Sequence, residues 1–274
     1  MQASYILHGC VDGWHGQAQT MRMYAPNERL RRHLERRDTA YVDPDHDDAG
    51  DVLTVDDSTR GAADACLLAR ALGHHVTLFV NPWQILSGRD YWFSRFDALV
   101  DGRRAREARI GRTTYDLTNT AGMYDFRWAI RPQLVIADEA AAHRLLDEVA
   151  LVLGAEDAIV PNFAHPIDLS DLRALHAAGV RFGNHGWDHR CITALSADEQ
   201  RAQLVATGDW LREQVGTAPR DYAVPFGQAL PAADVRAAVP GAIYLVRPRA
   251  GATDPAYRYR INLTPTLQAD HGSP

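Results

Sequence analysis

The fold is decided by a short stretch near residue 55, where an apolar run leads directly into two carboxylates: Asp51-Val52-Leu53-Thr54-Val55-Asp56-Asp57-Ser58. The apolar run predicts a buried strand over 51–55. An alanine- and leucine-rich segment predicts a helix over 61–72, and a second buried strand is expected over 76–80, before Asn81-Pro82. Strand, helix and strand make a βαβ unit, so we expect a parallel sheet and an α/β fold.

Most of the remaining chain continues this alternation. Its apolar periodicity predicts strands over 5–7, 158–160 and 243–246, and helices over 28–37, 135–153, 169–178 and 197–215. The pattern is weaker over 86–131, where a basic run is followed by polar residues, so we expect an insertion or a lid there. Neither a repeat nor a linker divides the chain, and residues 1–274 are expected to form a single domain.

The composition excludes several classes of protein. All 29 basic residues are arginine, which excludes chemistry that needs a lysine amine: Schiff-base aldol chemistry, pyridoxal phosphate and the phosphate-binding P-loop. The net charge of -6 opposes binding to a phosphate backbone. We therefore expect no nucleic-acid partner.

The cysteines and the N-terminal sequence indicate a reducing compartment. Cys10, Cys66 and Cys191 are odd in number and widely spaced, so neither a disulfide framework nor a thiolate zinc cluster is expected. The first residues lack the basic region of a signal peptide, and no run approaches ~18 apolar residues. We expect a cytoplasmic protein without a transmembrane segment, and the oligomeric state is left open.

Asp56 and Asp57 stand where the first buried strand meets a loop. In α/β folds, functional sites are built at the carboxyl ends of strands. Because side chains alternate along a strand, both acids can face one site only if the strand breaks between them, which the following Ser58-Thr59-Arg60 permits. The alternative is a solvated turn with a helix N-cap, two roles that aspartate also favours.

The segment His185-Gly186-Trp187-Asp188-His189 sets two histidines four residues apart. On one helical turn the two rings would share a face, about 5–6 Å apart, and could bind one metal ion. The alternative is a histidine pair in the core or on the surface that binds nothing. The order of motifs favours the metal: the aspartate pair comes first, then the histidine pair, then Ala223-Val224-Pro225-Phe226-Gly227.

This order of motifs resembles the polysaccharide deacetylases, the NodB-homology group of carbohydrate esterases. The resemblance covers most of residues 1–85 and 155–265. It implies a single-domain deformed (β/α) barrel with about seven parallel strands and the site at their carboxyl ends. It also implies the site residues: Asp56 is the catalytic base, Asp57, His185 and His189 are the metal ligands, and residues 223–227 match the family motif R-x-P-[YF]-G.

Two imidazoles and one carboxylate suit one divalent metal ion. Zinc is the first choice, with cobalt, nickel and manganese as alternatives. Such an ion lowers the pKa of a bound water to about 7 and polarises an acetamide carbonyl. Because an amine leaves poorly unless it is protonated, amide hydrolysis needs an acid as well as a base.

The resemblance implies His8 as that acid. Most of the family carries a histidine in a late L-x-H motif, but only His271 follows residue 230 here. One branch, which includes the poly-N-acetylglucosamine deacetylases, carries the histidine on an N-terminal strand, and Tyr5-Ile6-Leu7-His8-Gly9 resembles that segment. The alternative is an ordinary histidine at a strand end.

The sequence departs from the family pattern at two positions. Ala223 stands where the family has an arginine that orients the base, and Arg260 is a candidate stand-in, although it also reads as a charge at a strand edge. Ser58 replaces a glycine, which matters only if the turn needs a positive φ. The candidate substrate-binding residues are Pro225, Phe226, Trp187, Tyr222 and Arg260.

The expected function is metal-dependent hydrolysis of an acetamide, the N-deacetylation of an acetamido sugar or a related intracellular amide. The substrate is a small molecule or a saccharide. The same site would also suit a deformylase or a cyclic amide or imide hydrolase. A third hypothesis is a catalytically weak relative that binds carbohydrate; its support is Ala223, and its binding residues would be Trp83, Trp92, Trp187 and Tyr222.

Overall fold

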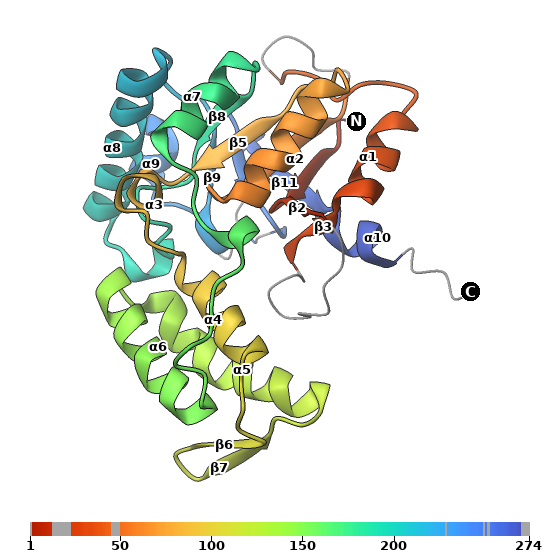
Figure 1. Cartoon of the computed structure of the whole chain (residues 1–274). Helices are drawn as coiled ribbons and strands as arrows, with labels where there is room; N and C mark the ends of the chain where they lie inside the picture. The colour runs from red at the N-terminus through yellow and green to blue at the C-terminus, as the bar shows by residue number, and fades with distance from the viewer. Residues whose placement is uncertain are drawn as a thin grey trace.

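The computed structural model of the 274-residue chain describes residues 2–12, 23–44, 50–227, 229–248, 250 and 253–269. Its centre is a closed barrel of parallel strands in the order β1-β11-β10-β9-β8-β5-β4 (Figure 1). The strands are β1 (Ser4–Leu7), β4 (Val52–Asp56), β5 (Thr77–Val80), β8 (Arg181–Asn184), β9 (Tyr222–Ala223), β10 (Ile243–Leu245) and β11 (Tyr257–Asn262). The expected barrel of about seven parallel strands is confirmed.

The predicted βαβ unit forms one side of this barrel. Every residue of β4 is buried, because the barrel interior covers one face of the strand and helices cover the other. The helix α2 (Arg60–Ala71) begins at Thr59, whose side chain accepts a hydrogen bond from the Ala62 amide. β1 lies beside β4, with Leu7 opposite Val55. Residues that follow β1 and β4 therefore emerge at the same edge.

Further helices surround the barrel. They are α1 (Asn27–Glu35), α3 (Pro82–Ser87), α7 (Leu169–Ala177), α8 (Ala197–Val215), α9 (Ala233–Ala238) and α10 (Thr264–Ala269). Both α7 and α8 begin with a capping box, at Asp168 and Ser196. The short elements are β2 (Cys10–Val11), β3 (Ala25–Pro26) and the 3-10 turns Asn162–Ala164, Ile192–Ala194 and Pro225–Gly227. None of the described helices combines the length and apolar character needed to cross a membrane.

A helical lobe extends from one end of the barrel (Figure 1). It consists of α4 (Trp92–Asp101), the hairpin of β6 (Glu107–Ile110) and β7 (Thr113–Asp116), α5 (Thr120–Ile136) and α6 (Glu139–Leu153). The lobe has its own core, in which Phe96, Phe126 and Leu146 are buried. It contains most of the segment 86–131, and it continues beyond that segment through α6, which packs on α4.

Two expected elements differ from the structure. The helix expected over 135–153 is divided, because Asp138 caps a new helix by accepting a hydrogen bond from the Ala141 amide. The strand expected over 158–160 is absent from the structure, and these residues are irregular. Val160 alone is buried, in a small cluster with Tyr24 and Ala164, whereas Ile159 is 81% exposed.

Candidate metal centre and active site

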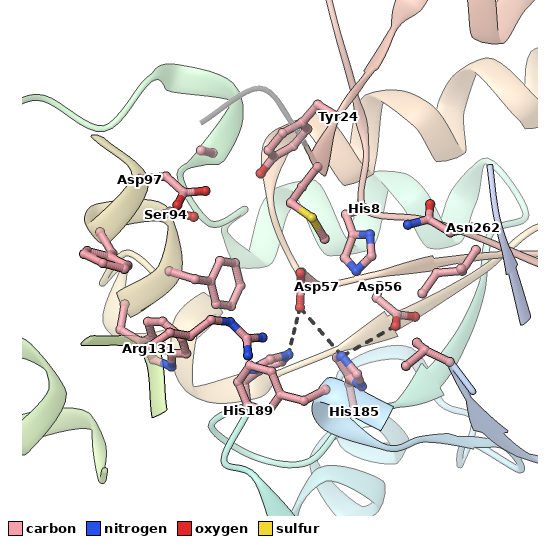
Figure 2. A pocket seen from close by; sticks show the side chains of 18 of the residues that line it. His8, Tyr24, Asp56, Asp57, Ser94, Asp97, Arg131, His185, His189 and Asn262 are labelled. Carbon is pink, nitrogen blue, oxygen red and sulfur yellow. Dashed lines mark ion pairs between the residues drawn. The ribbon is translucent and has the colours of Figure 1, made fainter. Parts of the chain in front are cut away.

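The predicted catalytic residues gather where the barrel strands end. Asp56 is the last residue of β4, His185 directly follows β8, and His8 directly follows β1. All three line one cavity of about 520 Å³, together with Asp57 and His189 (Figure 2). The fold therefore brings residues from distant parts of the chain to a single site.

Asp57 turns the chain so that both carboxylates face the cavity. It adopts the left-handed conformation, with φ 69°, immediately after β4. This conformation ends the alternation of side chains that a continuing strand would impose. It is uncommon for residues other than glycine and often marks a functional site. Because Asp57 takes this conformation and Ser58 does not, the turn does not require glycine at position 58.

His185 and His189 lie in a loop after β8, so the expected helical turn is wrong. Gly186 and His189 have left-handed φ values of 76° and 58°, which a right-handed helix does not accommodate. The loop nevertheless brings the two rings together, with centroids 4.9 Å apart. A folded loop therefore places the two histidine rings as close together as one helical turn would.

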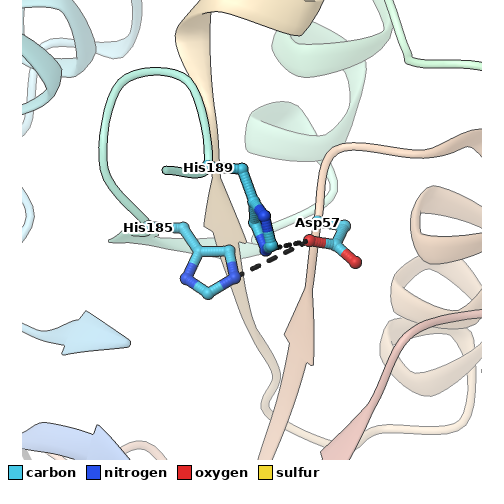
Figure 3. Close-up of side chains that lie close together, drawn as sticks. All are labelled: Asp57, His185 and His189. Atoms are coloured by element: carbon cyan, nitrogen blue, oxygen red, sulfur yellow. Dashed lines mark ion pairs between the residues drawn. The ribbon is translucent and has the colours of Figure 1, made fainter. Parts of the chain in front are cut away.

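Side-chain atoms of Asp57, His185 and His189 form a compact group of potential metal ligands (Figure 3). The Asp57 Oδ1 is 3.2 Å from the His189 Nε2 and 3.6 Å from the His185 Nε2. One ligand atom from each residue lies within 4.8 Å of the other two, and all three residues are buried. Within the described ranges this is the only group of histidine, cysteine or acidic residues arranged in this way.

The ionisation and orientation of these side chains fit a divalent cation. Burial lowers the pKa of His185 to about 4, so its ring is neutral at neutral pH. Its Nδ1 donates a hydrogen bond to the Ala223 carbonyl, 2.7 Å away, which leaves the Nε2 lone pair for a metal. Burial raises the pKa of Asp57, but His189, followed by His8 and His185, more than offsets this and brings it to about 2. Imidazole nitrogens and a carboxylate oxygen are ligands that zinc accepts.

Arg260 holds the predicted base. Its Nη1 lies 2.5 Å from the Asp56 Oδ1 and its Nη2 lies 2.7 Å from the Asp56 Oδ2, which is a bidentate ion pair. Nη1 also donates to the Thr54 hydroxyl at 3.2 Å. The Arg260 side chain is fully buried. Burial raises the pKa of Asp56, but the charge of Arg260 contributes most to lowering it below its usual value.

Arg260 therefore replaces the arginine that is missing at position 223. Residue 223 on β9 and residue 260 on β11 belong to different strands, and β10 lies between them. The guanidinium reaches Asp56 across the barrel interior, next to the rings of Phe79 and Tyr244, each 5.7 Å from the Arg260 Cζ. Its contacts make Arg260 a positioning residue for Asp56. Arg260 also lines the cavity, and its expected role in substrate binding stays a prediction.

His8 faces the same cavity as Asp57, His185 and His189 (Figure 2). Burial lowers its pKa, and the attraction of Asp57 and Asp56 only partly opposes this effect. Gly9 fixes the exit of β1, because it has a φ of 137° and packs closely on α2. A Cβ at this position would lie 2.5 Å from the Gly61 carbonyl carbon. The late histidine, His271, is outside the described residues.

A buried hydrogen-bond network supports both motifs, and sequence analysis did not identify it. The Tyr91 hydroxyl accepts a hydrogen bond from the Ser58 amide at 2.8 Å and donates to the Asn81 Oδ1 at 3.0 Å. Asn81 in turn donates to the backbone carbonyls of His185, at 2.6 Å, and Gly186, at 3.1 Å. The network connects the turn at Asp57 to the histidine loop. Asn81-Pro82 was recognised only as the end of a strand, because its partners are distant in sequence.

Replacing Tyr91 with phenylalanine should destabilise the protein. The change leaves the buried Ser58 amide and the Asn81 carbonyl oxygen without their partner, so we expect the free energy of unfolding to fall by about 1–3 kcal/mol. Urea denaturation measures this difference. The matched control is Tyr115→Phe in the lobe, where the hydroxyl has no hydrogen bond to any described residue. Equal stability of the two variants would contradict the structural role of the network.

The expected substrate-binding residues separate into two groups. Phe226 lines the cavity, with its ring centroid 4.7 Å from that of His189, and it is the third left-handed non-glycine residue at the site. Trp187, Tyr222 and Pro225 are not among the described residues that line the cavity, and their role in substrate binding stays a prediction. Tyr222, on β9, packs in a core cluster with Ile243 and Leu245 of β10, and Trp187 packs against the main core.

The helical lobe contributes cavity residues that sequence analysis did not assign to the site. From α4 these include Trp92, Phe93 and Asp97, and from α5 they include Tyr124, Arg127, Trp128 and Arg131. Trp92 was considered only as a carbohydrate contact. The spacing of the α5 residues was the available signal, but without the fold it did not show which face of the helix meets the barrel.

The chain is similar to known proteins both in sequence and in fold. The model of the polysaccharide deacetylase family matches residues 46–241. The solved structure of IcaB from Ammonifex degensii has a TM-score of 0.56 and 13% identity, covering 98% of this chain and 97% of that one. A de-N-acetylase from Aggregatibacter actinomycetemcomitans has a TM-score of 0.52 and 11% identity, covering 95% and 94%.

A third solved structure, a polysaccharide deacetylase from Bacillus cereus, has a TM-score of 0.54 and 10% identity. The match covers 95% of this chain and 64% of that chain, so this chain spans less than two thirds of its length. At these identities, the structural likeness shows a shared fold. The family match extends over most of the chain and includes the aspartate and histidine motifs. The chain therefore belongs to the polysaccharide deacetylase family.

Proposed function

We propose that the protein is a divalent-metal-dependent hydrolase that removes the acetyl group from an acetamido sugar. The observation that carries this proposal is the grouping of Asp57, His185 and His189 beside the Asp56–Arg260 ion pair in one cavity. Family membership supports a hydrolase that acts on the acetamide bond of a sugar. Zinc is the proposed metal, with cobalt, nickel or manganese as alternatives.

Asp57, His185 and His189 would hold the cation, and Asp56 is left to act as the base. When bound, the cation supplies Lewis acidity, which makes a water molecule more acidic and an acetamide carbonyl more electrophilic. Asp56 accepts the proton of the attacking water. Its ion pair with Arg260 keeps it ionised and fixes both carboxylate oxygens in orientation.

His8 is proposed to protonate the nitrogen of the departing amine. Because burial lowers its pKa, the ring is neutral at rest and must gain a proton during turnover. The two aspartates attract that proton, and a protonated ring with a low pKa is a strong acid toward the amine. His8 and Asp56 thus supply the acid and the base from adjacent strands.

The ion pair between Arg260 and Asp56 argues against a catalytically weak relative. The main argument for such a relative was the missing arginine at position 223, and Arg260 performs the expected task of orienting Asp56. The cytoplasmic setting belongs to the proposal. It is supported by Cys10, Cys66 and Cys191, which are buried and unpaired thiols. These thiols suit a reducing compartment.

Acetate release from a panel of acetamido sugars tests the proposed function. The metal-loaded protein should release acetate, a chelator should abolish the activity, and added zinc should restore it. Turnover of formamides or cyclic imides in place of acetamides would favour the alternative hydrolases. Stoichiometric metal without hydrolysis of any of these amides would contradict the proposal.

Replacing His8 with alanine should separate amide from ester hydrolysis. We expect the kcat for the amide to fall by roughly 10²–10⁴, because the amine then leaves unprotonated. An activated aryl acetate has a leaving group that needs no proton, so its hydrolysis should fall much less. Steady-state kinetics on both substrates measure the difference. Equal losses on the two substrates would show that His8 supports the metal or the developing oxyanion instead.

A further inference from the structure

The helix α5 presents one continuous face to the cavity. Tyr124, Arg127, Trp128 and Arg131 all line it, at the i, i+3, i+4 and i+7 spacing of a single helical face. These side chains come from the lobe, whereas the metal ligands come from the barrel. Helix α5 therefore forms a wall of the cavity that does not belong to the barrel. Along this wall, arginine side chains alternate with large aromatic rings.

Arg131 extends this wall toward the metal centre. Its Cζ lies 5.7 Å from the centroid of the Phe226 ring, and that ring lies 4.7 Å from the ring of His189. The Cζ also lies 5.6 Å from the Trp128 ring. Figure 2 shows the Arg131 side chain directed toward His189. A substrate with its acetamide at the metal centre would thus meet this guanidinium on the far side of the Phe226 ring.

The cavity has the opposite charge to the protein as a whole. The chain carries a net charge of -6, yet the cavity is lined by four arginines and three aspartates. Asp56 pairs with Arg260, and Asp97 pairs with Arg127. The third aspartate is Asp57, and a cation bound to it would make the lining more positive.

Arg247 adds positive charge from the barrel side. It follows β10, is exposed and lines the same cavity. No carboxylate in the described parts of the chain forms an ion pair with it. Arginine binds phosphate or carboxylate through its planar array of donors. Arg131 and Arg247 can therefore receive an anionic group from two sides of the cavity.

This charge disfavours a neutral glycan polymer as the substrate. Each deacetylation leaves an ammonium group, so a processed polymer becomes a polycation, which a positive cavity repels. The same field attracts an anionic substrate. A volume of about 520 Å³ also lies in the range of small-molecule sites.

An exposed aromatic pair lies at the outer end of the α5 face. Tyr124 and Trp128 are 51% and 50% exposed, and their ring centroids are 5.8 Å apart. Large rings in this position offer a stacking surface for a sugar ring or a nucleobase.

We propose that the substrate is an acetamido sugar that carries a phosphoester. This proposal rests on the deacetylase function above. The acetamide lies at the metal centre, and the phosphate group lies between Arg131 and Arg247. The rest of the substrate, a sugar ring or a nucleobase, contacts Tyr124 and Trp128. The lobe is then the element that selects the substrate.

Specificity constants for acetate release test this assignment. The substrates are uridine diphosphate N-acetylglucosamine, N-acetylglucosamine 1-phosphate and neutral N,N′-diacetylchitobiose. We expect kcat/KM to be at least about tenfold higher for one of the phosphoesters than for the neutral disaccharide, since charge-assisted hydrogen bonds are strong. In the Arg131→Gln, Arg247→Gln double variant this preference should fall by about tenfold or more. The proposal would be overturned if the native protein had a higher kcat/KM for the neutral disaccharide than for both phosphoesters. It would also be overturned if the double variant kept the native preference for the phosphoester.

A matched control removes one charge from the lobe outside the cavity. Arg144 lies exposed on α6 and does not line the cavity, so Arg144→Gln should keep the full preference. Metal content and far-UV circular dichroism show whether each variant is folded. A loss of preference in Arg144→Gln equal to that in the Arg131→Gln, Arg247→Gln double variant would attribute the effect to overall charge and overturn the assignment.

Titration calorimetry separates this inference from the proposed function. If no acetate is released but the phosphoesters bind and the double variant weakens binding at least about tenfold, the anion site stands and the deacetylase function fails. If acetate is released but the phosphoesters bind no better than the disaccharide, the function stands and the anion site fails.

The Trp128→Ala variant distinguishes the two phosphoester sources. Weaker binding of the nucleotide sugar alone assigns the ring to the nucleobase. Equal weakening with both ligands assigns it to the sugar that they share, and the ring then gives the nucleotide sugar no advantage over the simple sugar phosphate. Either result supports the α5 face as the binding wall, and unchanged binding of both ligands would exclude Trp128 from it.

Discussion

Replacement of both His185 and His189 with alanine should abolish metal binding. The native protein is expected to hold about one divalent ion per chain, and the double variant removes two of the three protein ligands. Affinity should fall by several orders of magnitude, because a single carboxylate retains little of the binding energy. Elemental analysis after dialysis against metal-free buffer measures the occupancy.

The control for this experiment replaces two histidines outside the cavity. His75 and His176 are exposed, and neither lines the cavity, so their double alanine variant should retain full occupancy. If the His185, His189 double variant also kept full metal occupancy, the metal would have to bind at another part of the chain. The site assignment would then be wrong, whatever the activity of the protein.

Replacement of Asp56 with asparagine should lower kcat by roughly 10²–10⁴ while the metal stays bound. This is the usual contribution of a general base, and Asp56 already has both oxygens bonded to Arg260, which suits a base better than a metal ligand. Asp57→Asn should instead lose the metal. Elemental analysis and steady-state kinetics on both variants test this division. Loss of metal from both would mean that both carboxylates bind the cation.

The Arg260→Gln variant should change the pH dependence of the reaction. The base acts in its ionised form, so activity is lost as the pH falls through the pKa of Asp56. Arg260 lowers that pKa against the effect of burial, and without the guanidinium the effect of burial dominates. The acidic limb of the kcat/KM profile should therefore move to higher pH. A uniform loss of activity at every pH, with no movement of the limb, would indicate a purely structural role.

The sequence by itself predicted the βαβ unit and, through the family resemblance, the barrel and most of the candidate site. Strands and helices follow from local periodicity and capping, so the βαβ unit at 51–80 and the caps at Asp168 and Ser196 were predictable. The candidate metal ligands and Asp56 were predicted from short motifs in a fixed order. Residues within such motifs are close in the chain, and local patterns are sufficient to find them.

Only the tertiary structure decided how these residues are supported. Arg260 is 204 positions from Asp56, and Tyr91 connects to Ser58 across 33 positions. The helical lobe extended beyond the expected segment, and the histidine loop replaced a helical turn. The face of α5 that meets the cavity was likewise visible only in the fold. Such contacts depend on which strands and helices become neighbours, and that arrangement is set by long-range packing that local patterns do not encode.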